Sequence, residues 1–524
     1  MRACFLAWVA TAVLFVALGA TGCLSADQVE LVIVGTEPIE GAPPPSLLRV
    51  RIIEAETGQL VVENTVQSAD GGLAGLGALQ SGTTYVLGLD ALFDAGTCAN
   101  DRAVGVSQPF VHRAGGYSIT IQVGCADEFG RTSSQPIEPR LAPGLTTTAD
   151  GTAILAGGTP RVELRTNDVE IEEVVELIER YDPFAGGFIA SGSMVTARAY
   201  PAVQAVPEGG VAVFGGVLPG EPPCEATIEL IVGAASSAKG PLSYSRCIPD
   251  ATLLPAVSRV VVGGWSGAPA ERAADYEAFD LDADAATGTP IAGLVYRRTP
   301  RLVALGDGET LLAVGGVQPG TGGPVVEALH FGDRCPTGAQ APCAVPVPAA
   351  GLDARGLDSM AAAYAACPSG GGAVYITGGV TGAGDARRAL DQILCVREEA
   401  DLSAMTVVQA GTLPEPRAAH EMVVVRGESP RLLLVGGGET TSVVSDLLDD
   451  ALLVPVDPCT CAESSPQVLQ RIPLPFTGSA VLHRLTTLPD GSVLLVGGAR
   501  IFIDEEGPRY EALGEAALLV PELP

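Results

Sequence analysis

The residue types that most often do chemistry are few and scattered in this chain of 524 residues. The four histidines, His112, His330, His420 and His483, lie far apart, without the short spacing of a metal-binding motif. There is no Gly-x-Ser-x-Gly nucleophile motif, and the single lysine, Lys239, does not lie in a phosphate-binding loop. We therefore predict no catalytic residue, no metal ligand and no cofactor.

Three aspartates at alternate positions, Asp280, Asp282 and Asp284, match the start of a calcium loop. An EF-hand needs glycine at the sixth position and glutamate at the twelfth, where this chain has Ala285 and Ile291. We expect an acidic, solvated turn at the end of a strand, with calcium binding in another geometry as the alternative.

The cysteines indicate an oxidising compartment. Ten of the twelve remain when Cys4 and Cys23, near the N-terminus, are set aside, an even number that predicts disulfides and no free-thiol chemistry. Nearness in the sequence predicts the bonds Cys98–Cys125, Cys224–Cys247, Cys335–Cys343 and Cys367–Cys395, which leaves Cys459 to Cys461. For these last two, a disulfide is preferred to a metal pair because no histidine lies nearby.

The N-terminus has the layout of a secretory signal, with one basic residue, Arg2, an apolar run and then small residues. Its end, Ala20-Thr21-Gly22-Cys23, resembles a bacterial lipobox. The resemblance implies a signal peptide over residues 1–22 and acylation of Cys23, which would anchor the chain to a membrane. Leu24 is not acidic, which favours the outer membrane, facing either the periplasm or the cell surface. Ordinary signal cleavage or an uncleaved anchor are the alternatives.

The formal net charge of −31 excludes nucleic acid and anionic surfaces as partners of the body of the protein. We expect a monomer whose ligand is a protein or a glycan. Two insertions, residues 333–351 and 456–476, are candidate binding loops, because loops on a rigid scaffold often carry function.

One motif recurs seven times: a short apolar strand that ends in Gly-Gly. Successive copies lie 48 to 63 residues apart, enough for four short strands and their turns. An apolar run without alternation is typical of a strand buried on both faces, and paired glycines permit a sharp bend. The pairs are Gly157 and Gly158, Gly215 and Gly216, Gly263 and Gly264, Gly315 and Gly316, Gly378 and Gly379, Gly436 and Gly437, and Gly497 and Gly498.

These repeats resemble the kelch family. The stretch ERYDPFAGGFIASGSMVTARAYPAV, followed by VAVFGG, contains Tyr181-Asp182-Pro183, Phe188, Met194 and Arg198 in the order of a kelch unit. PEPRAAHEMVVV followed by RLLLVGG repeats the Arg-x-x-His entry with Arg417 and His420. RLAPGLTTTADGTAILAGG is similar to the version in galactose-oxidase-type propellers, whereas the third copy lacks a clear Arg-x-x-His. The resemblance implies an all-β, seven-bladed kelch-like β-propeller over residues 135–524, with His420 in a packing role.

A copper–radical oxidase of that type would need two histidines, two tyrosines and a cysteine linked to one tyrosine. Tyr364 and Cys367 are neighbours in the sequence, but the full set is not recognisable. We also expect the segment around residues 133–139 to supply an outer strand that closes the ring, because the last repeat is short.

Residues 23–130 lack the Gly-Gly motif and contain β-like runs at 29–35, 47–55, 60–66, 84–91 and 117–124. Five strands in this length predict a small β-sandwich of immunoglobulin or fibronectin type, as a spacer or as a separate binding module. The sequence thus predicts an exported, lipid-anchored, noncatalytic scaffold at the cell envelope. The alternative is a carbohydrate-active or oxidative enzyme that uses the propeller channel.

Overall fold

The structure is a computed structural model of the chain, in which strands dominate and no α-helix occurs among the described residues. It describes Val13–Leu14 and residues 29–522, apart from positions 38, 40, 41, 43, 44, 56–58, 68–78, 94–95, 114–116, 166–167, 208, 221–223, 265–275, 281–287, 292–296, 317–323, 337–339, 350–358, 383–386, 426–428, 440–445, 463–468, 479 and 505–506. No helix in this described part is long and apolar enough to cross a membrane.

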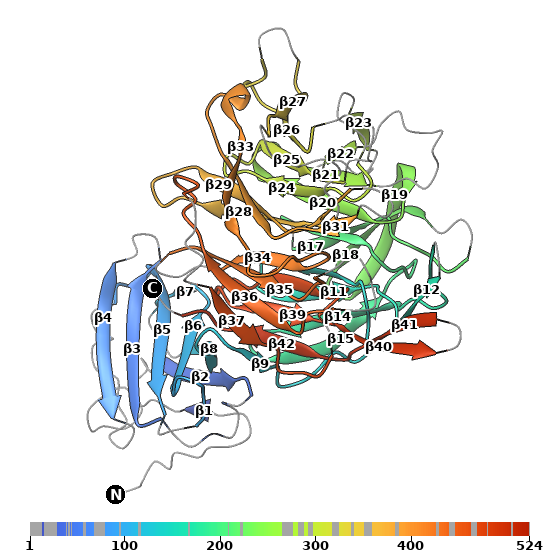
Figure 1. Ribbon diagram of the computed structural model, residues 1–524. Coiled ribbons are helices and arrows are strands. Elements are labelled where there is room, and N and C mark those ends of the chain that lie inside the picture. The colour runs from blue at the N-terminus through green and yellow to red at the C-terminus, as the bar shows by residue number, and fades with distance from the viewer. Residues whose placement is uncertain are drawn as a thin grey trace, which may run out of the picture.

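Seven four-stranded antiparallel sheets, here called blades, form a ring (Figure 1). Their inner strands β10, β16, β20, β24, β28, β34 and β38 contact one another in this order, and β38 contacts β10 again. This arrangement confirms the predicted class, an all-β fold of the β-propeller type.

The first four blades are β10 (Gly144–Thr147), β11 (Ala153–Ala156), β14 (Leu177–Asp182) and β15 (Gly187–Ser193); β16 (Ala202–Val206), β17 (Gly210–Phe214), β18 (Glu225–Val232) and β19 (Ala235–Arg246); β20 (Pro249–Leu254), β21 (Arg259–Gly264), β22 (Tyr276–Asp280) and β23 (Thr289–Ile291); and β24 (Arg301–Ala304), β25 (Thr310–Val314), β26 (Val326–His330) and β27 (Cys343–Val347). The other three are β28 (Ala361–Ala366), β29 (Gly372–Thr377), β32 (Gln392–Arg397) and β33 (Val407–Thr412); β34 (Glu421–Val425), β35 (Arg431–Val435), β36 (Asp450–Pro455) and β37 (Gln470–Pro473); and β38 (Arg484–Thr487), β39 (Val493–Val496), β42 (Ala516–Leu519) and β9 (Phe129–Arg131).

The strand that leads into Gly-Gly is the second strand of each blade, and it is buried on both faces between neighbouring blades. This burial explains its continuous apolar sequence. All of these glycines except Gly263 adopt positive φ, as at Gly157 (66°) and Gly158 (102°), and a Cβ on Gly158 would lie 2.9 Å from the carbonyl oxygen of Leu141. The ring thus has a glycine face, where the Gly-Gly pairs and the starts of the inner strands lie. The opposite turn face carries tight turns such as Asp150-Gly151.

The ring closes through β9 rather than through the predicted segment. β9 pairs with β42 as the outer strand of the seventh blade. The expected closing segment, residues 133–139, instead leads into the first blade, where the amide groups of Ile137 and Glu138 donate to Glu179. A three-residue strand has too little pattern to be seen in the sequence, and only its partner β42 identifies it.

A buried arginine–carboxylate pair recurs at the entry to five blades. Each arginine precedes an inner strand, and its carboxylate lies on the third strand of the same blade. The guanidinium also donates to a Gly-Gly carbonyl, as from Arg198 to Gly215 at 3.3 Å. The pairs are Arg140–Glu179, Arg198–Glu229, Arg246–Glu277, Arg297–Glu327 and Arg417–Asp450.

These pairs are buried, and in the Arg198–Glu229 pair backbone groups bind both partners. Arg198 and Glu229 are both 0% exposed. Glu229 accepts from the amide groups of Val195 and Thr196, both at 2.9 Å, and Arg198 donates to the carbonyl of Thr227 at 2.8 Å. Each pair therefore ties the segment that enters a blade to its second and third strands.

The N-terminal strands form one connected eight-stranded sheet beside the ring (Figure 1). Its strands are β1 (Val13–Leu14), β2 (Val29–Gly35), β3 (Leu47–Glu54), β4 (Leu60–Gln67), β5 (Thr84–Leu92), β6 (Arg102–Ser107), β7 (Phe110–Val111) and β8 (Tyr117–Cys125). The five predicted runs are strands, and β6 and β7 are additional. The order is β1-β2-β8-β6-β5-β3-β4, with β7 on β5 and β2 parallel to β8.

This N-terminal sheet is attached to the turn face of the ring. Ala126 forms a parallel bridge with Val520, and Asp127 accepts two hydrogen bonds from Arg431. The buried Gln122 side chain donates to the hydroxyl of Tyr181 and to the carbonyl of Pro183. A mixed set of ion-paired and desolvated polar contacts thus holds the two parts together.

A further four-stranded sheet stands on the glycine face and was not predicted. It combines β12 (Arg161–Arg165) and β13 (Asp168–Glu170), which follow the first Gly-Gly pair, with β40 (Ala499–Asp504) and β41 (Gly507–Ala512), which follow the last. β12 pairs with β41, so the first and last blades are joined here a second time. The short pair β30 (Val380–Thr381) and β31 (Arg388–Ala389) extends the fifth blade.

Five disulfides are present, which indicates that the chain folds in an oxidising compartment. Cys98–Cys125, Cys224–Cys247 and Cys335–Cys343 pair as expected. The pairs Cys367–Cys395 and Cys459–Cys461 were wrong: the bonds are Cys367–Cys459 and Cys395–Cys461. The loop after β36 folds back on the fifth blade, so both of its cysteines reach the neighbouring blade instead of each other.

Removing the last ten residues, 515–524, should abolish cooperative folding of the whole ring. The deletion takes away β42, which lies between β39 and β9, and thereby opens the seventh blade. Circular dichroism melting should show no cooperative transition, whereas deletion of residues 523–524 alone should leave the melt unchanged. A truncated chain that melts like the full one would contradict the closure.

Replacing Arg198 by methionine should lower the free energy of unfolding by about 3–5 kcal/mol, because Glu229 would keep a buried, unpaired charge. The double variant Arg198→Met/Glu229→Gln should recover part of this loss in urea denaturation. Arg161→Met removes an exposed pair with Glu172 and should cost no more than about 1 kcal/mol. Equal losses for Arg198→Met and Arg161→Met would show that the buried pair has no special role.

Candidate functional site

Three charged side chains from different blades meet inside the channel near the glycine face. Arg301 begins β24, Glu421 begins β34 and Arg484 begins β38. Nη2 of Arg301 lies 3.0 Å from Oε1 of Glu421, and Nη1 of Arg484 lies 2.7 Å from the same oxygen. Because the fifth blade separates the fourth from the sixth, the contact between Arg301 and Glu421 crosses the channel. We call these three residues the channel cluster.

The channel cluster is accessible, unlike the arginine–carboxylate pairs between blades. The side chains of Arg301, Glu421 and Arg484 are 32%, 17% and 25% exposed. They start inner strands, so the channel and its mouth are where a ligand would reach them. The cluster therefore combines strong hydrogen-bond donors and an acceptor in a concave, partly desolvated position.

The electrostatics of the channel cluster keep it ionised. Burial acts to raise the pKa of Glu421, but the guanidinium groups of Arg301 and Arg484 outweigh it and lower that pKa to about 2. The Glu421 carboxylate in turn raises the pKa of Arg301. Asp250, on β20, accepts a hydrogen bond from the amide group of Leu302 at 2.7 Å, and burial raises the pKa of this carboxyl group.

The mouth above the channel cluster is built from residues in the left-handed region two positions before an inner strand. Ala142, Tyr200, Ser359, Ala419 and Leu482 have φ between 46° and 56°. Their backbones link blade to blade: Ala142 donates to Leu482, Tyr200 donates to Ala142, and Ala419 donates to Ser359. Burial raises the pKa of Tyr200 to about 12, and the charge of Arg484 acts against this rise. The Tyr200 hydroxyl is therefore a neutral donor beside the channel cluster.

The four histidines do not converge. His112 Nδ1 lies 2.7 Å from the Tyr117 hydroxyl in the N-terminal sheet, and His330 Nδ1 lies 2.8 Å from Thr310 Oγ1 in the fourth blade. His420 and His483 are buried next to the channel cluster, and Nε2 of His420 lies 2.8 Å from Thr377 Oγ1. This placement agrees with the packing role expected for His420.

Desolvation keeps both of these buried histidines neutral. It lowers the pKa of His420 to about 3, with a further contribution from the charge of Arg417. It lowers the pKa of His483 to about 4, although the Glu421 carboxylate opposes the shift.

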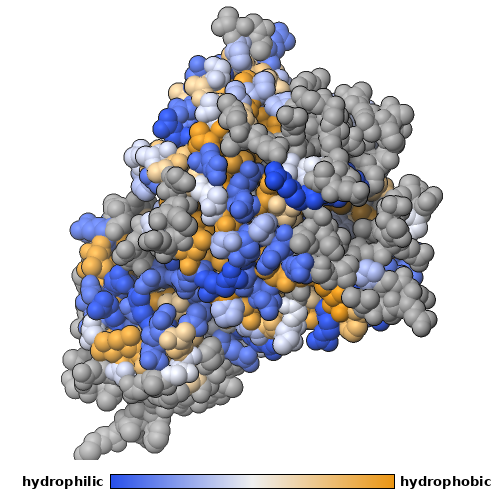
Figure 2. Space-filling model, in the orientation of Figure 1, coloured by the Kyte–Doolittle hydropathy of each residue, from blue (hydrophilic) through white to orange (hydrophobic). Residues whose placement is uncertain are grey.

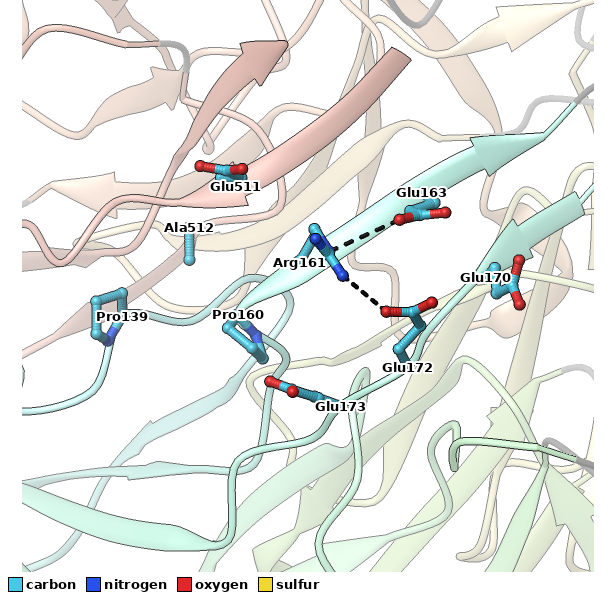
Figure 3. A pocket seen from close by; sticks show the side chains of 9 residues that line it. All are labelled: Pro139, Pro160, Arg161, Glu163, Glu170, Glu172, Glu173, Glu511 and Ala512. Atoms are coloured by element: carbon cyan, nitrogen blue, oxygen red, sulfur yellow. Dashed lines mark hydrogen bonds and ion pairs between the residues drawn. The ribbon is translucent and has the colours of Figure 1, made fainter. Parts of the chain in front are cut away.

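An acidic pocket of about 370 Å³ lies beside the mouth, against the additional sheet on the glycine face (Figure 3). Arg161 points between Glu163 and Glu172 and pairs with both. The side chains are largely exposed, and among the described residues no group of three potential ligands could hold a metal ion. The remaining lining residues are Pro139, Pro160, Glu170, Glu173, Glu511 and Ala512.

The other predicted positions lie apart from the channel cluster. Asp280 is exposed at the end of β22, whereas Asp282 and Asp284 lie outside the described residues, as do Cys23 and most of the predicted signal peptide. Cys335–Cys343 closes the loop between β26 and β27, and Cys367–Cys459 joins the turn after β28 to the loop after β36.

The residues in place do not fit a copper–radical centre. The sulfur of Cys367 is bonded to Cys459, so it is not available to Tyr364, whose hydroxyl donates to Glu398 at 2.9 Å. At the channel mouth, the side chain of Leu482 offers no atom that could bind copper. In the described part of the chain, His420 and His483 are not joined by a third ligand.

Sequence reasoning missed the channel cluster and three of the five buried arginines. Arg140, Arg246 and Arg297 share with Arg198 a spacing of 17 or 18 residues to the first glycine of the following pair, and this spacing was the available signal. Arg301, Glu421 and Arg484 carry no such signal, because they are 120 and 63 residues apart.

No protein-family model matches the chain, and no curated protein sequence matches it. Among solved structures, the fold is similar to a fungal alcohol oxidase of the AA5 family in complex with copper, at 13% identity and a TM-score of 0.50, covering 75% of each chain. A structure of YjhT is also similar, at 12% identity and a TM-score of 0.42, covering 64% of this chain and 98% of that one. The first likeness supports a galactose-oxidase-like propeller fold.

This comparison corrects the prediction of a noncatalytic protein. That prediction relied on missing motifs, whereas a related fold carries a copper alcohol oxidase. On a ring, reacting groups come from blades far apart in the sequence, as the channel cluster does here. The absence of a local motif therefore does not exclude catalysis.

Stability should fall in acid because of His420 and His483. Their pKa values are below 6.5 in the folded chain, so the unfolded chain binds more protons as the pH drops. The free energy of unfolding should be highest above pH 6.5 and decrease towards pH 4 by about 1.4 kcal/mol per pH unit for each histidine. Urea denaturation of wild type and His420→Gln/His483→Gln should give a flatter pH dependence for the variant, and parallel curves would contradict it.

Proposed function

We propose that this chain is an exported, lipid-anchored protein of the cell envelope whose propeller binds a carbohydrate at the channel cluster. In this proposal the ring is a seven-bladed kelch-like propeller formed by residues 135–524, with β9 as an added outer strand in the seventh blade. The N-terminal part, residues 23–130, is a sandwich-like spacer. The protein acts as a monomer, without nucleic acid.

The channel cluster carries the proposal. Guanidinium groups donate hydrogen bonds and the Glu421 carboxylate accepts them, so together they match the hydroxyl groups of a sugar. Tyr200 adds a neutral hydroxyl close to Arg484. Two guanidinium groups and one carboxylate give the cluster a net charge of +1, but the chain as a whole carries −31, so a neutral glycan is favoured over a strongly acidic one.

Envelope attachment is supported by three features of the chain. Residues 20–23 match a lipobox, with Cys23 as the acylated residue. The five disulfides require an oxidising compartment. Leu24 gives no acidic retention signal, so the outer membrane is the proposed destination.

A second candidate function is an enzyme that acts on the same carbohydrate. The likeness in fold to an alcohol oxidase favours it. Copper chemistry is not part of this proposal, because the described side chains do not form the required ligand set. Mass spectrometry of a bound glycan before and after incubation with the protein separates turnover from binding.

The Glu421→Gln variant tests the carbohydrate site. A glycan array should first identify a neutral glycan that binds the purified protein. Isothermal titration calorimetry should then show at least about a tenfold loss of affinity for Glu421→Gln, because a charged hydrogen-bond acceptor contributes about 1.5–3 kcal/mol. Glu172→Gln, in the acidic pocket, should bind as wild type does. Binding that is equal in wild type and Glu421→Gln, or no binding of any neutral glycan, would refute the proposal.

A further inference from the structure

The N-terminal sheet has two unlike ends. β8 runs from Tyr117 to Cys125, and Ala126 then contacts the last blade, so the Cys125 end is next to the ring. β2 is parallel to β8, with Val29 opposite Tyr117. Val29 therefore lies at the far end, about 30 Å along the strands from the ring. We call this far end, with Thr84 at the start of β5, the distal end.

The distal end exposes apolar and aromatic groups. Leu60 is 46% exposed and Val111 is 43% exposed. Leu60 is opposite Ile53, and Val111 is opposite Thr84, which places both at this end. Apolar side chains are also visible among charged ones over the N-terminal sheet in Figure 2.

Three aromatic rings pack together near the distal end. The ring of Phe110 lies 6.2 Å from that of Tyr85 and 6.1 Å from that of Tyr117. The exposed Arg113 adds a positive charge in a chain that is strongly negative overall. Tyrosine and arginine beside exposed aliphatic groups are typical of a surface that meets lipid headgroups.

The position of the proposed anchor agrees with this surface. Only residues 24–28 separate Cys23 from Val29, and they can span at most about 20 Å. An acyl chain on Cys23 would therefore hold the distal end near the bilayer. This step rests on the lipid anchoring proposed above.

We propose that the distal end, with Leu60, Val111 and Tyr117, rests on the membrane surface, so that the mouth of the channel on the glycine face opens away from the membrane. The N-terminal sheet contacts the ring at the turn face, through Ala126 and Asp127. The channel cluster lies at the opposite face. The net charge of −31 keeps the ring off an anionic bilayer, whereas the exposed apolar side chains and Arg113 allow the distal end to approach it.

Tryptophan fluorescence tests this orientation with two matched variants. Val111→Trp reports on the distal end, and Val195→Trp reports on the glycine face, where Val195 is 58% exposed. Both are made in the Trp265→Phe background, so the introduced residue is the emitter in the processed chain. The acylated protein is reconstituted into liposomes of phosphatidylcholine and phosphatidylglycerol that contain brominated lipid. Quenching should be at least twofold stronger for Val111→Trp.

Flotation separates a failure of the anchor from a failure of the orientation. Wild type should float with liposomes, and Cys23→Ala should not. If wild type does not float, the anchoring on which the inference rests is wrong, whatever the glycan binding shows. If wild type floats but quenching is equal at both positions or stronger at Val195→Trp, the proposed membrane-contacting surface is wrong.

Discussion

The buried arginine–carboxylate pair is the interaction on which the ring depends. Each guanidinium binds a Gly-Gly carbonyl and a carboxylate of the same blade, so it joins the chain that enters a blade to the strands at its centre. Such a pair contributes little net energy over an apolar contact, but loss of one partner leaves a buried charge. The pair therefore selects one register between the entering chain and the Gly-Gly strand, and it does so in five blades.

The register of the entering chain also determines which side chains face the channel. In five blades the entry segment turns through a left-handed residue two positions before the inner strand, and all seven inner strands start beside the Gly-Gly pairs at the glycine face. Side chains at these first positions then meet across the channel, although they are far apart in the sequence. Arg301, Glu421 and Arg484 form an ion-paired, partly exposed cluster for this reason, in contrast with the buried pairs between blades.

The N-terminal sheet and the ring are continuous in structure. β8 leads into β9, and β9 completes the seventh blade, so the segment that leaves the N-terminal sheet also closes the ring. The sheet on the glycine face joins the same first and last blades. Both β9 and the sheet on the glycine face lie where the first and last blades meet. A ring made from a linear chain is weakest there, because only there do the ends of the sequence have to meet.

The sequence by itself determined the β class, the repeat and three of the disulfides, because each is recorded in neighbouring residues. The Gly-Gly strands are continuous apolar runs, and Cys98, in the loop between β5 and β6, lies only 27 residues from Cys125 at the end of β8. Only the tertiary structure decided the closing strand β9, the crossed bonds Cys367–Cys459 and Cys395–Cys461, and the channel cluster. These depend on which distant segments the ring brings together, and no local pattern of residue types encodes a distance across a channel.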